Sequence, residues 1–167
     1  MADIKFVYGA SSNLTVTNLH SLPSSSTHVT GWESGEIDNS SGKYLDYLVS
    51  AKITVAAASL SAGEIRLWCV PRLDDSNYPG GFDGTESTET TPLDDENGTN
   101  AGAVLLKSVA TDTTNSQVYY FAAVSVAAAF GGVCPEKFVL FITQSTAQNL
   151  AASGNQVSTK SVHLSVA

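Results

Sequence analysis

Residues that commonly perform chemistry are few and scattered in this chain. The three histidines are His20 and His28, in a polar N-terminal segment, and His163, in an alternating stretch near the C-terminus. No Gly-x-Ser-x-Gly elbow, His-Glu-x-x-His helix or Walker loop occurs. Nucleophilic catalysis requires a nucleophile beside a positioned base, and no such pair can be assembled. We therefore expect a protein that is not an enzyme, with no catalytic residues and no cofactor.

The two cysteines, Cys69 and Cys134, lie far apart in the sequence, and neither has a second Cys or His at metal-ligand spacing. In a reducing compartment this pattern indicates two buried thiols. A disulfide remains an alternative if the strands that carry the two residues are neighbours.

Carboxylates gather between Leu73 and Asn100, a stretch called here the acidic segment. It contains no Lys or Arg, and the rest of the chain has equal numbers of acidic and basic residues, so the whole net charge of -8 belongs to this segment. Nucleic-acid binding is disfavoured because phosphate recognition requires a basic surface. The segment is also longer than the roughly 12–15 residues of an ordinary loop, and longer loops tend to be functional or disordered. Its acidic residues are Asp74, Asp75, Asp83, Glu86, Glu89, Asp94, Asp95 and Glu96.

Calcium is the one metal that the acidic segment suggests. Asp94 to Gly98 offers hard oxygen ligands followed by a glycine that permits a sharp turn. The spacing does not match an EF-hand loop, and a run of charge is more often a solvated surface. We therefore predict no metal site.

The elements that must carry these residues are predicted to be strands. A chain of 167 residues fits one domain, and it is 43% hydrophobic but only 14% charged, where about 25% is typical. Long surface helices usually need more charge on their exposed face, whereas Ser, Thr and small polar residues suit strands and turns. The composition therefore favours an all-β domain.

Alternation of side chains with a period of two supports the same class. From Leu45 to Ala56 apolar residues occupy every second position, which predicts a long strand. Val118 to Ala128 is apolar on both faces and predicts a central strand, with a helix as the alternative because of its alanines. Together the pattern predicts about eight strands in a sandwich or jelly roll. The remaining strand patterns cover residues 4–8, 14–17, 65–70, 138–143 and 162–166.

The N-terminal part gives two further expectations. Met1 to Lys5 begins as a strand rather than as a signal peptide, and no stretch approaches the roughly 20 apolar residues that span a bilayer, so we expect synthesis in a cytoplasm and no membrane partner. Gly9 to Thr30 is rich in Ser, Thr and Asn. It is either an extended arm that adds to a neighbour's sheet or an ordinary edge hairpin and loop of the same domain.

Aromatic residues provide the candidates for surface contact. Most of those that could form a sugar-binding platform lie within strand patterns, which favours the core for them. Trp32 and Tyr78 lie in loop-like surroundings and are the best candidates for exposed contacts. The platform would consist of Trp32, Tyr44, Tyr47, Trp68 and Tyr78.

Several stretches resemble small structural proteins of tailed bacteriophages. Residues 31–39, Gly-Trp-Glu-Ser-Gly-Glu-Ile-Asp-Asn, are followed by residues 44–49, where the long strand pattern begins, and residues 129–135 and 138–141 show a similar likeness. The resemblance implies a jelly-roll cement or decoration protein on the outside of a capsid, bound to the major capsid protein and typically trimeric. Trp32, Glu33 and Asp38 of the first stretch are the expected interface residues, together with Tyr78, the other candidate for an exposed aromatic contact.

The expected function is therefore structural, namely decoration and stabilisation of a virion shell. The alternative is a tail-associated module that binds a receptor or a carbohydrate through exposed aromatic residues such as Trp32. The acidic segment is expected either to project away from the capsid or to dock on a basic patch of the capsid protein.

Overall fold

The structure is a computed structural model that describes residues 3–57, 60–90 and 102–166. Within these ranges it contains ten strands and one helical turn, so the all-β expectation is confirmed. None of the helical structure there is long and apolar enough to cross a membrane. The elements in chain order are β1 (Ile4–Asn13), β2 (Gly31–Glu33), β3 (Ile37–Asp38), β4 (Asp46–Thr54), β5 (Gly63–Pro71), β6 (Ser87–Glu89), β7 (Val104–Thr111), β8 (Val118–Ser125), α1 (Val126–Ala129), β9 (Lys137–Gln144) and β10 (Gln156–Val166).

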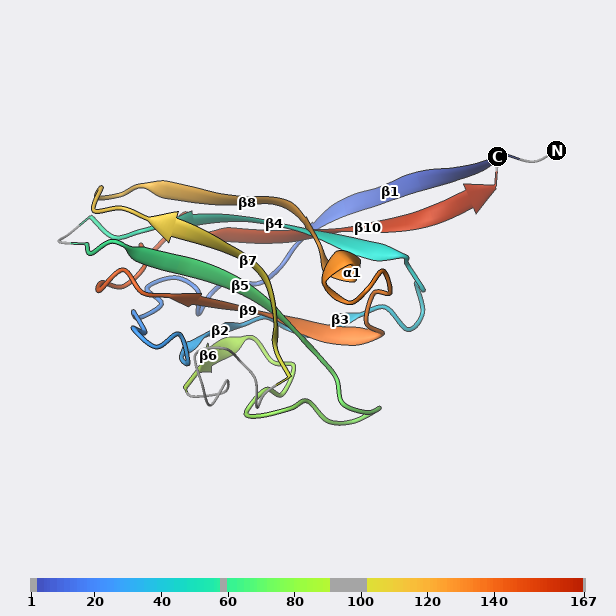
Figure 1. The fold of residues 1–167 in the computed structure, drawn as a ribbon, viewed down its shortest axis with the longest axis horizontal. Coiled ribbons are helices and arrows are strands. Elements are labelled where there is room, and N and C mark those ends of the chain that lie inside the picture. Colours follow the sequence, from blue (N-terminus) through green and yellow to red (C-terminus); the bar gives the residue numbers. More distant parts are fainter. Residues whose placement is uncertain (1–2, 58–59, 91–101, 167) are drawn as a thin grey trace.

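The strands form two antiparallel sheets that face each other (Figure 1). Sheet A has the order β1-β10-β4-β8, and sheet B has the order β6-β2-β9-β5-β7, with β3 also paired to β9. Along the chain, each strand pair encloses the next, and successive pairs alternate between sheet A and sheet B. From the outermost inward the pairs are β1/β10, β2/β9, β4/β8 and β5/β7. This connectivity is that of a jelly roll.

The core fills the space between the sheets. The alternating positions of β4 point inward as expected, with Tyr47, Val49, Ala51 and Ile53 all buried. Strand β9 lies in the middle of sheet B and is buried over almost its whole length. A second, smaller apolar cluster lies on the other side of sheet B, where Tyr78 and Phe82 of the acidic segment pack against Trp68, Val139 and Phe141.

The N-terminal segment is not an extended arm. Strand β1 runs on to Asn13 at the edge of sheet A, and the following residues pack on the same domain, with Leu19 and Leu22 fully buried. The strand expected at residues 14–17 is absent from this described part, which forms irregular backbone and a turn. This region belongs to the same domain, as the alternative expected, because burial of the two leucines holds the chain against its own core. It is not a hairpin, since β1 pairs with the distant β10.

Strand β8 is not a central strand. It lies at the edge of sheet A and is largely open to solvent, and the chain turns into α1 at Val126. Ser125 caps this helical turn, since its hydroxyl accepts from the Ala128 amide at 3.0 Å. Alanine is small enough to be tolerated on an exposed sheet face, so its abundance here did not signify burial.

The acidic segment is not one simple loop. Between residues 73 and 90 it packs on sheet B through Tyr78 and Phe82 and adds strand β6 beside β2. Residues 91–101 lie outside the described part, and with them the suggested calcium ligands from Asp94 to Gly98.

One part of sheet A extends beyond the sandwich. Residues Ile4–Tyr8 of β1 pair with Val162–Val166 of β10, whereas β4 pairs with β10 only as far as Val162. This two-stranded extension, called here the terminal ribbon, projects from one end of the molecule and carries both chain termini at its tip (Figure 1).

Candidate functional site

The residues behind the phage resemblance hold the acidic segment against sheet B. Trp32 of β2 is fully buried, and its indole Nε1 donates to Glu86 Oε1 at 2.7 Å. The Glu86 carboxylate also accepts from the backbone amide and the side-chain Nδ2 of Asn18, both at 2.8 Å. Three parts of the chain therefore meet at one carboxylate.

Glu33 makes a second attachment to the same segment. Its Oε1 accepts from the backbone amides of Gly84 at 2.7 Å and Asp83 at 3.2 Å. The side chain is completely buried, and burial raises its pKa to about 7 despite these hydrogen bonds. Its other oxygen, Oε2, has no hydrogen-bond partner among the described residues. Glu33 therefore orders the turn at residues 83–84 while its own ionisation is disfavoured.

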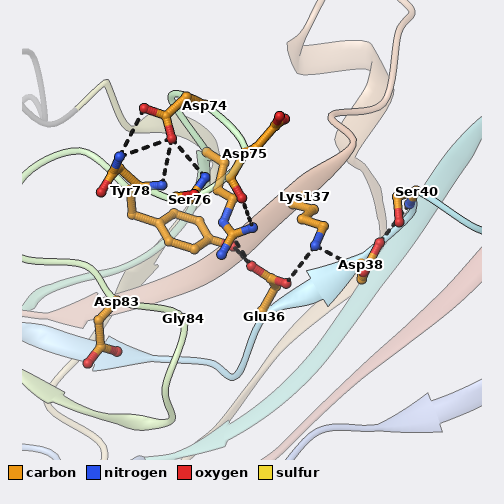
Figure 2. Close-up of polar contacts among 12 residues, drawn as sticks. Glu36, Asp38, Ser40, Asp74, Asp75, Ser76, Tyr78, Asp83, Gly84 and Lys137 are labelled. Carbon is orange, nitrogen blue, oxygen red and sulfur yellow. Dashed lines mark hydrogen bonds and ion pairs between the residues drawn. The ribbon is translucent and has the colours of Figure 1, made fainter.

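Glu36 lies at the centre of a charged network on the outside of sheet B (Figure 2). Its Oε2 accepts from the Tyr78 hydroxyl at 2.9 Å and lies 3.1 Å from Arg72 Nε. The Arg72 guanidinium also stacks over the Tyr78 ring, 5.3 Å from the ring centroid. On the other side Lys137 Nζ lies 3.5 Å from Glu36 Oε1 and 3.2 Å from Asp38 Oδ2. The network thus joins the acidic segment to the ends of β3, β5 and β9.

Hydrogen bonds and neighbouring charges favour the charged forms of Asp38 and Lys137. Hydrogen bonds from Ser40, together with Lys137, lower the pKa of Asp38 to about 2. Asp38 in turn raises the pKa of Lys137, and burial raises that of Tyr78 well above its ordinary value. At neutral pH Asp38 and Lys137 are therefore charged, and the Tyr78 hydroxyl keeps its proton.

An open groove of about 500 Å³ lies beside the network. Arg72 closes one side of it, donating from Nη1 to the Asp75 carbonyl oxygen at 2.8 Å. Asp74 stabilises the adjoining turn, since its carboxylate accepts from the amides of Ser76 and Asn77, both at 2.8 Å. Asp74 and Asp75 are exposed, so two carboxylates are held at the rim. The groove is lined by Ser40, Pro71, Arg72, Leu73, Asp74, Asp75, Pro135, Glu136 and Lys137.

Trp32, Glu33 and Tyr78 lie at the acidic segment, and Asp38 is linked to it through Lys137 and Glu36, but three of these four predicted interface residues are not exposed. Trp32 and Glu33 are fully buried and Tyr78 is 9% exposed, so the expectation that Trp32 and Tyr78 make exposed contacts is wrong. Trp32 fills the core and Tyr78 packs on Phe82 and Val139, because the loop-like sequence around each is folded back onto sheet B. Asp38 alone among the four is exposed.

The sugar platform is also wrong, since it required exposed aromatic faces. Tyr47 and Trp68 are buried as well, and Tyr44 is half-buried against the core. The preference for the core at the strand-borne residues of this set is confirmed.

The sequence interpretation missed Glu36, Arg72 and Lys137. Glu36 was part of the quoted 31–39 stretch, and its position between Glu33 and Asp38 was the only available signal. Arg72 and Lys137 each lie next to or within a strand end, and nothing in the local pattern of either points to a partner. Their association depends on β5 and β9 being paired, with Pro71 opposite Phe138.

Both cysteines are free thiols, Cys69 buried and Cys134 half-buried. Burial raises the pKa of Cys134 to about 12 and that of Cys69 well above its ordinary range, so both are protonated at neutral pH. Within the described ranges no group of three or more His, Cys, Asp or Glu side chains is arranged to hold a metal ion.

Comparison of the chain with protein-family models, with curated proteins and with solved structures finds no match.

Proposed function

We propose that this chain is a structural virion protein that decorates and stabilises the outer surface of a phage capsid without catalysis. It binds the lattice of the major capsid protein, and the rim of the groove beside Glu36 is its contact surface. The observation that carries the proposal is that the residues behind the phage resemblance fix the described part of the acidic segment, residues 73–90, as a rigid, carboxylate-bearing surface on sheet B.

Rigidity of that surface supports binding to a repeated lattice. Trp32, Glu33 and Glu36 each make a side-chain hydrogen bond or ion pair with residues 72–86. A surface that is ordered before it binds loses little conformational entropy on docking. Its exposed carboxylates, at Asp74, Asp75 and Asp83, match a basic patch on the partner.

The carbohydrate-binding alternative loses its support. It depended on exposed Trp32 and Tyr78, and both side chains are inside the molecule.

Co-sedimentation with undecorated capsids, followed by imaging, tests the proposal. We expect ordered density at repeated lattice positions, and binding that weakens as salt is raised. Free protein in the supernatant at every salt concentration would exclude capsid decoration.

Charge-neutral variants locate the contact. Asp75→Asn combined with Asp83→Asn removes the charge but keeps one side-chain oxygen at each position, so residue 83 can still accept from the Thr85 amide, which lies 2.7 Å from Asp83 Oδ1. We expect weaker capsid binding with a shallower salt dependence. Asp112→Asn is the matched control, because Asp112 is an exposed carboxylate that follows β7, away from the groove. Unchanged, salt-insensitive binding of the double variant would mean that the acidic segment projects away from the shell.

A further inference from the structure

The terminal ribbon exposes a row of large apolar side chains on one face. The register pairs Ile4 with Val166, Phe6 with Leu164 and Tyr8 with Val162, so all six side chains point the same way. Ile4, Phe6 and Tyr8 are 69%, 70% and 61% exposed, and Leu164 and Val166 are 48% and 71% exposed. A two-stranded ribbon is marginally stable by itself in water, and exposed apolar patches of this kind mark interaction surfaces.

The same face continues into a groove on the outside of sheet A. Val162 pairs with Asp46 and Lys160 with Leu48, so the row leads from the ribbon onto β4. Here an open groove of about 500 Å³ begins at Tyr8. Its floor is formed by small side chains, Ser50, Ala123 and Ser158, and it is also lined by Ser11, Leu48, Thr159 and Lys160.

A local irregularity of the backbone creates the groove. The register of β4 against β8 shifts between Val49 and Ala51, and Ala123 adopts a positive φ of 48°. The Ala123 amide donates to the side chain of Ser50, with 3.0 Å between the nitrogen and Oγ. Because the residues at this irregularity are Ser and Ala, the sheet face is hollow where larger side chains would have filled it.

We infer that the terminal ribbon of one copy of this chain packs on the sheet A groove of a second copy, with the Phe6 side chain entering the groove. The ribbon tip and the groove are different parts of the surface of the same chain, so the contact is head-to-tail, a type that builds a closed ring or an open filament. This inference names the self-association surface within the proposed virion role, but it rests on the sheet A face and not on the capsid contact.

The apolar area is adequate for such an interface. Full burial of one aromatic side chain removes roughly 150–250 Å² from water, so the five exposed ribbon residues offer on the order of 500 Å². The groove side chains add to this, and each copy contributes both a ribbon and a groove. The sum approaches the roughly 800 Å² that each partner buries in a stable complex.

Charge favours a second copy on this face rather than on any other. Copies with a net charge of -8 repel each other, but the described part of the acidic segment lies on sheet B. The groove itself is lined by one charged residue, Lys160, and Asp3 directly precedes the ribbon tip. Seating the tip in the groove therefore brings a carboxylate to an amine and keeps the acidic surfaces apart.

Face packing fits β1 better than edge-to-edge pairing does. The register of β1 against β10 shifts between Tyr8 and Ser11, where the chain contains Gly9. A Cβ atom at Gly9 would lie 2.3 Å from Ser161 Oγ, so a larger residue at the bulge would require that hydroxyl to rotate away. A bulge bends the strand and interrupts the row of edge groups that another strand would pair with.

The mass of the full chain in solution, measured by light scattering after size-exclusion chromatography, tests the inference. We expect an oligomer for the unchanged chain and for two controls, Lys5→Ser on the opposite face of the ribbon and Val133→Ser, an equally exposed apolar residue elsewhere. The ribbon variant, Phe6→Ser with Leu164→Ser, should give the monomer mass. The separate variant Ser11→Arg fills the groove and should give the monomer mass as well. Unchanged circular dichroism shows that each variant still folds.

Two outcomes would overturn the inference. One is that the unchanged chain is a monomer at micromolar concentration. If the ribbon variants then also lose capsid binding, the ribbon docks on the shell and not on a second copy. The other is an oligomer that survives both the ribbon variant and Ser11→Arg. Failure of an intact oligomer to bind capsids counts against the proposed virion role alone, because the self-association result is independent of it.

Discussion

At the residue scale, two buried ionisable side chains respond to pH in opposite directions. Glu33 has a pKa of about 7 when folded, against an ordinary 4.5, so the folded state binds its proton more readily and stability falls as pH rises between these values. The pKa of His28 is lowered from 6.5 to about 4 by burial and by Arg66, so stability falls as pH drops through that range. Between about pH 4.5 and 6.5 the two effects offset each other.

In the Glu33→Gln variant, the dependence of stability on pH should come from His28 alone. Glutamine keeps an oxygen to accept from the Asp83 and Gly84 amides but has no proton to gain. We expect the variant's free energy of unfolding to decrease on acidification from pH 6.5 towards 4, by up to about 3 kcal/mol, while that of the unchanged chain varies little. Urea unfolding in steps of pH measures this. Superimposable profiles for the two proteins would contradict it.

His28→Gln should give the opposite slope. The imidazole Nδ1 lies 2.9 Å from Thr143 Oγ1, a contact that a glutamine side chain can replace without a charge. With only Glu33 titrating, we expect stability to decrease as pH rises from about 4.5 to 7. The double variant Glu33→Gln, His28→Gln is the control, and it should be flat over this window, because the lowered pKa of Asp38 acts only below its ordinary value of 3.8.

At the scale of elements, β2 depends on a glycine for its place beside β9. A Cβ atom at Gly31 would lie 2.3 Å from the Ile142 carbonyl oxygen and 2.8 Å from both Phe141 Cζ and Thr143 Cγ2. Gly31→Ala should therefore push β2 away from β9 and destabilise the protein by about 1–3 kcal/mol. Gly35→Ala is the matched control, since nothing lies within 4 Å of a Cβ there. Equal urea midpoints for the two variants would contradict this account.

Elements with a regular local pattern could be predicted from the sequence, whereas those held by distant partners could not. Strand β4 was predicted because its inward and outward sides alternate without a break. Strands β2, β3 and β6 have only two or three residues each, too few to show a period. β7 was missed because Val104-Leu105-Leu106 disrupts its alternation.

The location of the candidate site could be predicted from the sequence, but the burial of its residues and their partners could not. The 31–39 stretch does lie at the acidic segment, yet Trp32 is buried in the core, and the partner of its indole N–H is Glu86, 54 positions away. A tryptophan flanked by Gly and Glu looks exposed until that partner is known. Likewise the ribbon residues looked like an ordinary alternating strand, and their exposure follows from β4 ending where β10 continues.

At the scale of the whole molecule, the two proposed contact surfaces lie on different sheets. The described carboxylates of the acidic segment accompany sheet B, while the ribbon and its groove belong to sheet A. One molecule can therefore use both surfaces at once. An oligomer built through sheet A would present several acidic surfaces to the capsid lattice together, which converts weak single contacts into strong overall binding.

If the oligomer presents several acidic surfaces together, loss of self-association should weaken capsid binding. Phe6→Ser with Leu164→Ser leaves the acidic surface intact, so each molecule should still bind capsids, but as a single contact. We expect its apparent affinity to fall by about 10²–10⁴-fold and its salt dependence to become shallower, because fewer ion pairs form in each binding event. Asp75→Asn with Asp83→Asn should also weaken binding but keep the oligomer mass, and Lys5→Ser should change neither property. Quantitative co-sedimentation at several salt concentrations measures both quantities. A monomeric ribbon variant that binds capsids as tightly as the unchanged chain would show that joining the acidic surfaces contributes nothing to decoration.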